Sequence, residues 1–322
     1  MRDHGGNLDL AIERHGGSAT AWLDLSTGIN RSPYPMSRAS PHAWRDLPTA
    51  AEMAMLCKAA TAAYGATGGV VALCGAQAAI QSIPLLRKPG LARIVGPTYN
   101  EHEASLLASG WEVEMVGELE ALDGADLAIV VNPNNPDGRH WNPDRLLARL
   151  ERVGVLVIDE SFADATPEIS LAGFTGAKGL IVLRSFGKFY GLAGLRLGFA
   201  LASESDAAAL RRLAGPWPVC GPAIEAGIAA LGDGEWTRAT RVRLLRDRER
   251  LDEFARAEGW KLVGGTALFR TYATHGALPA QTRLAESRVW TRIFPWSASW
   301  IRLGLPGNED EWKWLAGAFR HR

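Results

Sequence analysis

Between residues 69 and 203 the sequence alternates short apolar runs with segments of helical pattern. Apolar strands that alternate with helices are typical of a mostly parallel sheet covered by helices on both faces. We therefore predict an α/β fold whose large domain spans residues 35–232. The apolar runs are VVALC (70–74), ARIVG (92–96), LAIVV (127–131), VLVID (155–159), LIVLR (180–184) and RLGFALAS (196–203).

The pattern changes after Pro222. An arginine-rich helical pattern over about 235–258 is followed by β-like segments at KLVGG, ALFRTYA, RVWTRIF and WIRLGLP. Asn308 and Glu311 have the spacing of a capping box that opens a last helix. These features predict a smaller α+β domain over 233–322, and residues 1–34 are expected to form an N-terminal arm.

Composition excludes several classes of protein. Lysine plus arginine and aspartate plus glutamate both number 35, so no basic surface for nucleic acid is expected. No apolar run approaches the roughly 18 residues of a membrane span, and the start has no signal-peptide pattern. We expect no nucleic-acid or membrane partner and a cytoplasmic location.

The spacing of the cysteines and histidines indicates neither a disulfide framework nor a metal site. Cys57, Cys74 and Cys220 are far apart and odd in number, which favours buried free thiols over disulfides. The seven histidines show no HxH, HxxxH or cysteine-paired spacing, so no metal site is predicted.

Polar or glycine-rich residues follow five of the apolar runs, at the strand ends where open parallel sheets bind ligands. Two glycine-loop interpretations fail there: Val182 and Phe189 exclude a phosphate-binding loop at Lys188, and the glycines after Lys188 lack the GxGxxG spacing. The segments are Cys-Gly-Ala-Gln (74–77), Gly-Pro-Thr-Tyr (96–99), Asn-Pro-Asn-Asn-Pro-Asp-Gly (132–138), Asp-Glu-Ser-Phe (159–162) and Ser-Phe-Gly-Lys (185–188).

Lys188 and Arg196 fit a different cofactor. A lysine with apolar neighbours can form a Schiff base, and an arginine eight residues on suits a phosphate ester. Asp159 ends an apolar strand, where its carboxylate needs a cationic partner such as a pyridinium nitrogen. A loop lysine, a strand-edge arginine and an N-cap aspartate are the structural alternatives.

Two further strand ends fit the same cofactor. The Asn135 amide could donate to a phenolic oxygen, although Asn-Pro-x-Gly is also a common turn. Gly75, Ala76 and Gln77 open a helix, whose free N–H groups suit a phosphate.

In this order, the motifs resemble those of the class I/II aminotransferases, which are pyridoxal-phosphate (PLP) enzymes of fold type I. The resemblance covers about residues 24–306. It implies that Lys188 is the catalytic lysine bound to PLP, that Asp159 pairs with the pyridine nitrogen and that Asn135 contacts the phenolic oxygen. It also implies that Ala76, Gln77, Ser185 and Arg196 hold the cofactor phosphate.

The resemblance further implies a homodimer with shared active sites. Tyr64 would complete the neighbouring site, Arg302 would hold the substrate carboxylate, and His102 or Tyr99 would stack on the cofactor ring. Two positions depart from the pattern of many transaminases: Phe162 replaces a tyrosine and Gly187 replaces a serine.

The N-terminal segments HGGN (4–7) and LDLSTGINRSPYP (23–35) are similar to those of the threonine-phosphate decarboxylases of cobalamin biosynthesis. This similarity implies PLP-dependent loss of CO2 from L-threonine O-3-phosphate, a phosphorylated amino acid. His4, Gly28 and Asn30 would contact the substrate, with Arg31 and Arg292 as weaker candidates. The alternatives are a histidinol-phosphate-type aminotransferase and a non-catalytic scaffold protein.

Overall fold

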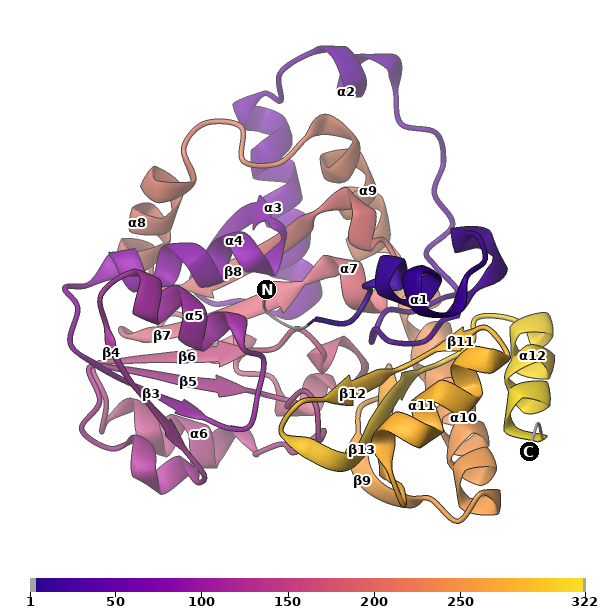
Figure 1. Ribbon diagram of the computed structural model, residues 1–322. Coiled ribbons are helices and arrows are strands. Elements are labelled where there is room, and N and C mark those ends of the chain that lie inside the picture. The colour runs from indigo at the N-terminus through magenta and orange to yellow at the C-terminus, as the bar shows by residue number, and fades with distance from the viewer. Residues whose placement is uncertain (1–3, 321–322) are drawn as a thin grey trace. The chain divides into compact units, whose positions relative to one another are not determined.

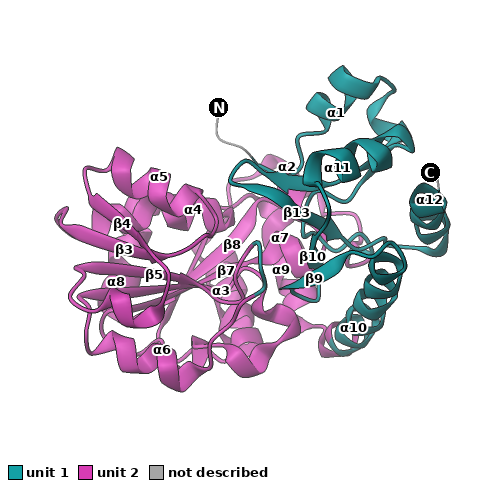
Figure 2. Cartoon of the chain, turned by 60° about the horizontal axis from the view of Figure 1, so that its bottom comes forward, with its two compact units in different colours: residues 1–33, 136–138, 238–322 teal, residues 34–135, 139–237 magenta. Residues whose placement is uncertain are grey.

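The computed structural model describes residues 4–320 and contains two compact units (Figure 2). Unit 1 comprises residues 1–33, 136–138 and 238–322, and unit 2 comprises residues 34–135 and 139–237. The N-terminal residues therefore belong with the C-terminal part of the chain. This division differs from the predicted one, in which the arm was separate and the small domain began at residue 233.

Unit 2 is built on a seven-stranded sheet with the order β2-β8-β7-β6-β5-β3-β4 (Figure 1). All neighbouring pairs are parallel except the two that involve β8, which confirms the predicted mostly parallel α/β fold. The strands are β2 (Gly69–Cys74), β3 (Leu91–Val95), β4 (Glu112–Val116), β5 (Leu127–Val131), β6 (Val155–Asp159), β7 (Leu180–Ser185) and β8 (Leu197–Ala202).

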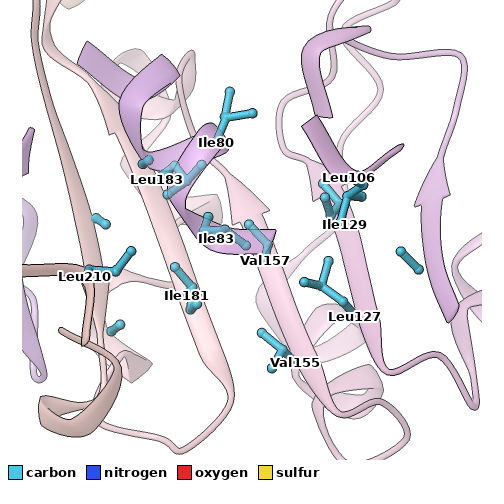
Figure 3. Close-up of a cluster of buried hydrophobic side chains, with 14 of the residues drawn as sticks. Ile80, Ile83, Leu106, Leu127, Ile129, Val155, Val157, Ile181, Leu183 and Leu210 are labelled. Atoms are coloured by element: carbon cyan, nitrogen blue, oxygen red, sulfur yellow. The ribbon is translucent and has the colours of Figure 1, made fainter. Parts of the chain in front are cut away.

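Helices cover both faces of this sheet. On one face, side chains such as Ile80, Leu106 and Leu210 pack against Val157 and Ile181 of the strands (Figure 3). These helices are α4 (Gly75–Ser82), α5 (Glu101–Ala108) and α8 (Glu204–Ala214), and the others in unit 2 are α2 (Pro41–Arg45), α3 (Ala50–Tyr64), α6 (Pro143–Leu150), α7 (Phe186–Phe189) and α9 (Gly221–Gly232).

Strand alternation decides which side chains reach the site. In β6, Val155 and Val157 belong to the core beneath α4 and α5, and Asp159 continues that face. The next residue, Glu160, therefore points to the opposite face because successive side chains of a strand alternate. The same rule separates Ser185 from Arg184 in β7.

Local signals set several helix starts. The Thr49 side chain accepts a hydrogen bond from Glu52 N while the Glu52 carboxylate accepts one from Thr49 N, which is a complete capping box for α3. Asn142 caps α6, and Pro143 stands in its first turn, where no N–H is required.

Unit 1 contains a four-stranded antiparallel sheet with the order β12-β13-β10-β9 and a parallel pair of short strands, β1 with β11. The strands are β1 (Leu23–Asp24), β9 (Lys261–Gly265), β10 (Phe269–Ala273), β11 (Val289–Trp290), β12 (Arg292–Phe294) and β13 (Ser297–Gly304). The helices are α1 (Leu8–His15), α10 (Gly234–Ala257), whose first turn lies in unit 2, α11 (Ala277–Glu286) and α12 (Glu309–Arg320).

The predicted capping box of the last helix is half formed. Asn308 Oδ1 accepts hydrogen bonds from Asp310 N and Glu311 N. The Glu311 carboxylate instead accepts a bond from Gly307 N and pairs with Arg31. The helix therefore begins where the sequence predicts, with a different partner for its glutamate.

The predictions for the three cysteines have a mixed outcome. Cys57, Cys74 and Cys220 are free thiols, as predicted, but Cys74 and Cys220 are exposed, so their predicted burial is wrong. Both lie directly before a helix, where the chain leaves the core. Within residues 4–320, no helix combines the length and apolar character needed to cross a bilayer.

Candidate active site

A pocket opens in unit 2 beyond the carboxyl ends of β6 and β7. Its position follows from the sheet, because parallel strands end at one edge and the chain turns there into α4 and α7. Seven residues predicted as site residues line it: Ala76, Gln77, Asn135, Asp159, Ser185, Lys188 and Arg196.

The Asp159 carboxylate is buried and firmly held. Its Oδ1 accepts hydrogen bonds from Ser161 N (2.9 Å) and Ser161 Oγ (2.5 Å), and its Oδ2 lies 2.9 Å from His102 Nε2. Burial alone would raise the pKa of Asp159, but the hydrogen bonds from His102 and Ser161 outweigh it and hold the pKa below its usual value. A negative charge is therefore maintained in the wall of the pocket.

His102 and Tyr99 have different positions. Tyr99 lines the pocket, whereas His102 is 2% exposed and lies behind Asp159. The prediction of His102 as a stacking residue finds no support in the pocket, because His102 is buried and does not line it. Of the two predicted candidates, the structure favours Tyr99 as the aromatic wall.

The start of α4 offers an anion site. Its first residue, Gly75, has a φ of +74°, and a Cβ there would stand 2.7 Å from Arg196 Nη2. A Cβ at Gly198 would stand 2.3 Å from Ala76 N. Glycine at 75 thus leaves room for the Arg196 guanidinium, and glycine at 198 lets β8 pack closely against the start of α4. A guanidinium beside the free N–H groups of a helix suits a phosphate.

Lys188 follows β7 on the short helix α7 and lies beside an apolar wall. Its Nζ is 5.6 Å from the centre of the Phe162 ring. Gly187, which departs from the transaminase pattern, has a packing reason: a Cβ there would come within 2.7 Å of Ala193 Cα. A serine could not occupy this position without a shift of the backbone.

Tyr64 is half-buried, and its hydroxyl is covered by its own chain. Its ring packs against Phe199 and beneath the Arg184 guanidinium, which lies 4.4 Å from the ring centre. Its hydroxyl is buried without a hydrogen-bond partner among the described residues, and burial raises its pKa, with a further contribution from Asp164. The predicted role of Tyr64 in a neighbouring site stays a prediction.

Behind Asp159 and Ser185, on the other face of the sheet, lies a buried ion cluster that sequence reasoning missed. Arg184 Nη1 bonds to Glu160 Oε2 (2.8 Å), and Arg184 Nη2 bonds to Asp164 Oδ1 (2.9 Å). Glu160 also accepts bonds from Ser170 Oγ and Leu171 N. The cluster connects Arg184 of β7 with Glu160 and Asp164, which follow β6, close to the strand ends that carry the pocket residues.

The charges of this cluster depend on one another. Burial would lower the pKa of Arg184, but the carboxylates of Asp164 and Glu160 raise it, so the guanidinium stays charged. Burial raises the pKa of Glu160 although Arg184 opposes the shift. The sequence signal for this cluster was that one apolar run ends in Arg184 and the preceding run ends in Asp159 and Glu160.

The predicted substrate residues lie in unit 1. Arg302 is 6% exposed, its Nη2 donates to Ser26 O (2.7 Å), and it stands directly opposite Arg292 in the β12–β13 pair. Burial, then the charge of Arg292, lowers the pKa of Arg302 to about 9. Two arginines opposed in this way would gain from a bound anion.

The other predicted substrate residues divide into two groups. His4 and Arg292 line a second pocket together with Arg14. Asn30 and Gly28 are buried, and Asn30 Oδ1 accepts bonds from Arg243 Nη2 and Ser32 N. The weaker candidate Arg31 is held by a two-point bond to Glu311, which argues against a substrate role.

The residues of unit 2 fit the cofactor that the sequence resemblance implies. The α4 start with Arg196 suits a phosphate, the Asp159 carboxylate suits a protonated ring nitrogen, and Lys188 reaches the pocket between them. No cluster of metal-ligating side chains occurs among residues 4–320.

Comparison with known proteins places these features in a family. The family model for aminotransferase class I and II matches residues 50–318. The chain is 42% identical over 325 residues to a Pseudomonas aeruginosa protein named threonine-phosphate decarboxylase, covering 99% of this chain and 97% of that protein. A Sinorhizobium sp. protein of the same name is 42% identical over 311 residues, covering 94% and 92%.

Other relatives match less of the sequence. A histidinol-phosphate aminotransferase of Archaeoglobus fulgidus is 34% identical over 134 residues, covering 42% of this chain and 39% of that protein. Among solved structures, histidinol-phosphate aminotransferase from Sinorhizobium meliloti in complex with pyridoxal-5'-phosphate has a TM-score of 0.82 at 18% identity. It covers 99% of this chain and 94% of that one, which shows a shared fold.

The buried cluster leads to a stability prediction. The Arg184→Met substitution should lower the free energy of unfolding by about 3–5 kcal/mol, because it leaves buried carboxylates without their cation. Arg145→Met, which removes an exposed pair with Glu120, is the control and should change little. Urea unfolding of both variants measures the difference, and equal small effects would show that the cluster does not stabilise the sheet.

Proposed function

The chain belongs to the aminotransferase class I and II family, and on this premise we propose that it is a PLP-dependent decarboxylase of L-threonine O-3-phosphate. The products are CO2 and (R)-1-amino-2-propanol O-2-phosphate, for the aminopropanol arm of cobalamin biosynthesis. The observation that carries this proposal is the 42% identity to two threonine-phosphate decarboxylases over nearly the whole chain.

The pocket of unit 2 holds the cofactor. Lys188 Nζ carries it covalently, the α4 start with Arg196 and Ser185 binds its phosphate, and Asn135 donates to its phenolic oxygen. When bound, PLP supplies an electron sink for the bond that breaks at the substrate α-carbon. The Asp159 carboxylate, kept ionised by His102 and Ser161, stabilises the positive ring nitrogen on which that chemistry depends.

Lys188 handles the proton. With the cofactor bound, the Lys188 Nζ would give a proton to the substrate α-carbon that has lost CO2. In an aminotransferase the same nitrogen would instead remove a proton from that carbon. The residues around the cofactor serve both reactions, so substrate orientation selects between them.

The cationic residues of unit 1 suit a substrate with two anionic groups. We assign the carboxylate to Arg302 and the phosphate to His4, Arg14 and Arg292. The lowered pKa of Arg302 supports this assignment, because a bound anion offsets the burial and the neighbouring charge of Arg292. An amino acid phosphate carries both groups.

The reaction itself gives the test. Cofactor-loaded protein incubated with L-threonine O-3-phosphate, without a 2-oxo acid, should release CO2 and aminopropanol phosphate in equal amounts. Lys188→Ala should reduce the rate by roughly a thousandfold or more, whereas the exposed Lys178→Ala control should leave it unchanged.

A different result would identify the alternative. Transfer of the amino group from histidinol phosphate to 2-oxoglutarate, with no CO2 from threonine phosphate, would contradict the proposal in favour of an aminotransferase. A folded, cofactor-loaded protein with neither activity would favour a scaffold role.

The oligomeric state is also part of the proposal. We infer a homodimer formed through the α2–α3 surface, defined by the exposed apolar residues Trp44, Leu47, Met55 and Trp217. Their elements adjoin one another, because α2 packs on α9, and Trp217 shares a pocket with residues of α3. An exposed group of large apolar side chains favours association. We place the enzyme in the cytoplasm, where its free cysteines stay reduced.

The double substitution Trp44→Asp/Trp217→Asp should yield a monomer, because it places charges in the proposed interface. Trp296→Asp, at a tryptophan of unit 1 about as exposed as Trp217, is the control and should remain dimeric. Sedimentation velocity distinguishes the two states. A dimeric double variant, or a monomeric unsubstituted protein, would overturn this part of the proposal.

A further inference from the structure

Glu101, in the first turn of α5, is a buried carboxylate that the reaction described above does not use. It is 7% exposed, and its Oε2 accepts a hydrogen bond from Gln77 Nε2 at 3.0 Å. Gln77 Oε1 in turn accepts one from the Tyr99 hydroxyl at 3.2 Å. Gln77 and Tyr99 line the unit 2 pocket. Glu101 is therefore connected to the pocket wall by these two hydrogen bonds.

The chemistry of these groups fixes the direction of each bond. An ionised carboxylate can only accept hydrogen bonds, so Gln77 must turn its amino group toward Glu101. The amide oxygen of Gln77 then faces the pocket side and takes the Tyr99 hydroxyl. A glutamine alone could adopt either amide orientation, and the carboxylate removes this choice.

The same turn of α5 also supports the ring-nitrogen end of the pocket. His102, the next residue, bonds to Asp159, and its ring meets the Tyr99 ring edge-on at 6.2 Å. Glu101 and His102, which are adjacent in the chain, are thus connected to Tyr99 and Asp159, two residues that line the pocket.

We propose that Glu101 is a positioning residue for the cofactor, which acts through the Gln77 amide to hold the Tyr99 ring against the cofactor face. The inference rests on the proposed cofactor site and adds a residue that does not touch the cofactor. Its loss should let the Gln77 amide turn over and remove the acceptor that orients the Tyr99 hydroxyl.

A rival explanation predicts the opposite change in PLP affinity when Glu101 is replaced. A buried negative charge close to the α4 anion site should, through charge alone, weaken the binding of a phosphate. If charge were the main effect, Glu101→Gln would bind PLP more tightly. If positioning is the main effect, the same variant binds PLP more weakly.

The test compares PLP dissociation constants, measured by fluorescence titration of the cofactor-free protein. Glu101→Gln should raise the dissociation constant about fivefold, which corresponds to one weakened hydrogen bond. Glu103→Gln, the other glutamate in the same turn, is the matched control and should bind as the unsubstituted protein does. The circular dichroism of the bound cofactor should change in the first variant alone.

A double-mutant cycle with Tyr99→Phe shows whether Glu101 acts through the tyrosine. In the Tyr99→Phe background, Glu101→Gln should change the dissociation constant by less than about twofold, since the connection is already broken. Gln77→Leu removes the residue that connects Glu101 with Tyr99, and it replaces Glu101→Gln in the test if that variant folds poorly. It too should weaken binding and abolish the coupling to Tyr99.

Three outcomes would overturn the inference: tighter PLP binding by Glu101→Gln, equal effects of the two glutamate variants, or additive effects of Glu101→Gln and Tyr99→Phe. These outcomes leave the proposed function intact if the unsubstituted protein binds PLP through Lys188. Failure of the unsubstituted protein to bind PLP would instead refute the cofactor site itself.

Discussion

The rest of the site depends on one buried charge, the carboxylate of Asp159. A carboxylate at the end of a covered strand is costly unless hydrogen bonds and an opposite charge replace its water. Ser161 supplies two of these bonds from the turn after β6, and His102 supplies the third from α5. A cation in the pocket would stabilise this charge further, and the ring nitrogen of the proposed cofactor would supply one. The parallel sheet makes this possible because it brings β6, β7 and the start of α4 to one edge.

A second buried group of charges keeps that edge in place from the other side of the sheet. Alternation along β6 and β7 sends Asp159 and Ser185 toward the pocket, and Glu160 and Arg184 away from it. The bonds of Arg184 to Glu160 and Asp164 then join the two strands behind the site. The site therefore has polar support in two layers, and Asp159 and Ser185 of the front layer line the pocket.

Most of the large unit could be predicted from the sequence because its strands are continuous apolar runs. The exception is β4, an edge strand whose sequence EVEMV carries charges on exposed positions and lacks that signal. Lys188 and Asn135 follow strand ends, so their meeting in one pocket was predictable. Arg196 instead precedes β8, and it reaches the same edge because β8 runs antiparallel to its neighbours. The glycines at 75 and 198 were visible too, but the contacts that explain them required coordinates: Arg196 approaches Gly75, and the backbone of the α4 start approaches Gly198.

Other features depend on contacts between distant segments, which spacing does not reveal. Tyr64 matches a family position in the sequence, and the structure adds that its ring packs against Phe199 and Arg184. His102 follows the third strand as the family pattern requires, and the structure adds that it bonds to Asp159. The grouping of residues 1–33 with 238–322 arises from pairs such as β1 with β11 and Arg31 with Glu311. Each pair joins residues more than 250 positions apart, and no local pattern identifies it.

The central claim is that Lys188 carries the cofactor. The most direct measurement is borohydride reduction of the cofactor-loaded protein, followed by peptide mass spectrometry. The account predicts a phosphopyridoxyl group on the peptide that contains Lys188 and on none of the other five lysines of the chain. Labelling of a different lysine, or labelling spread over the surface lysines, would contradict it.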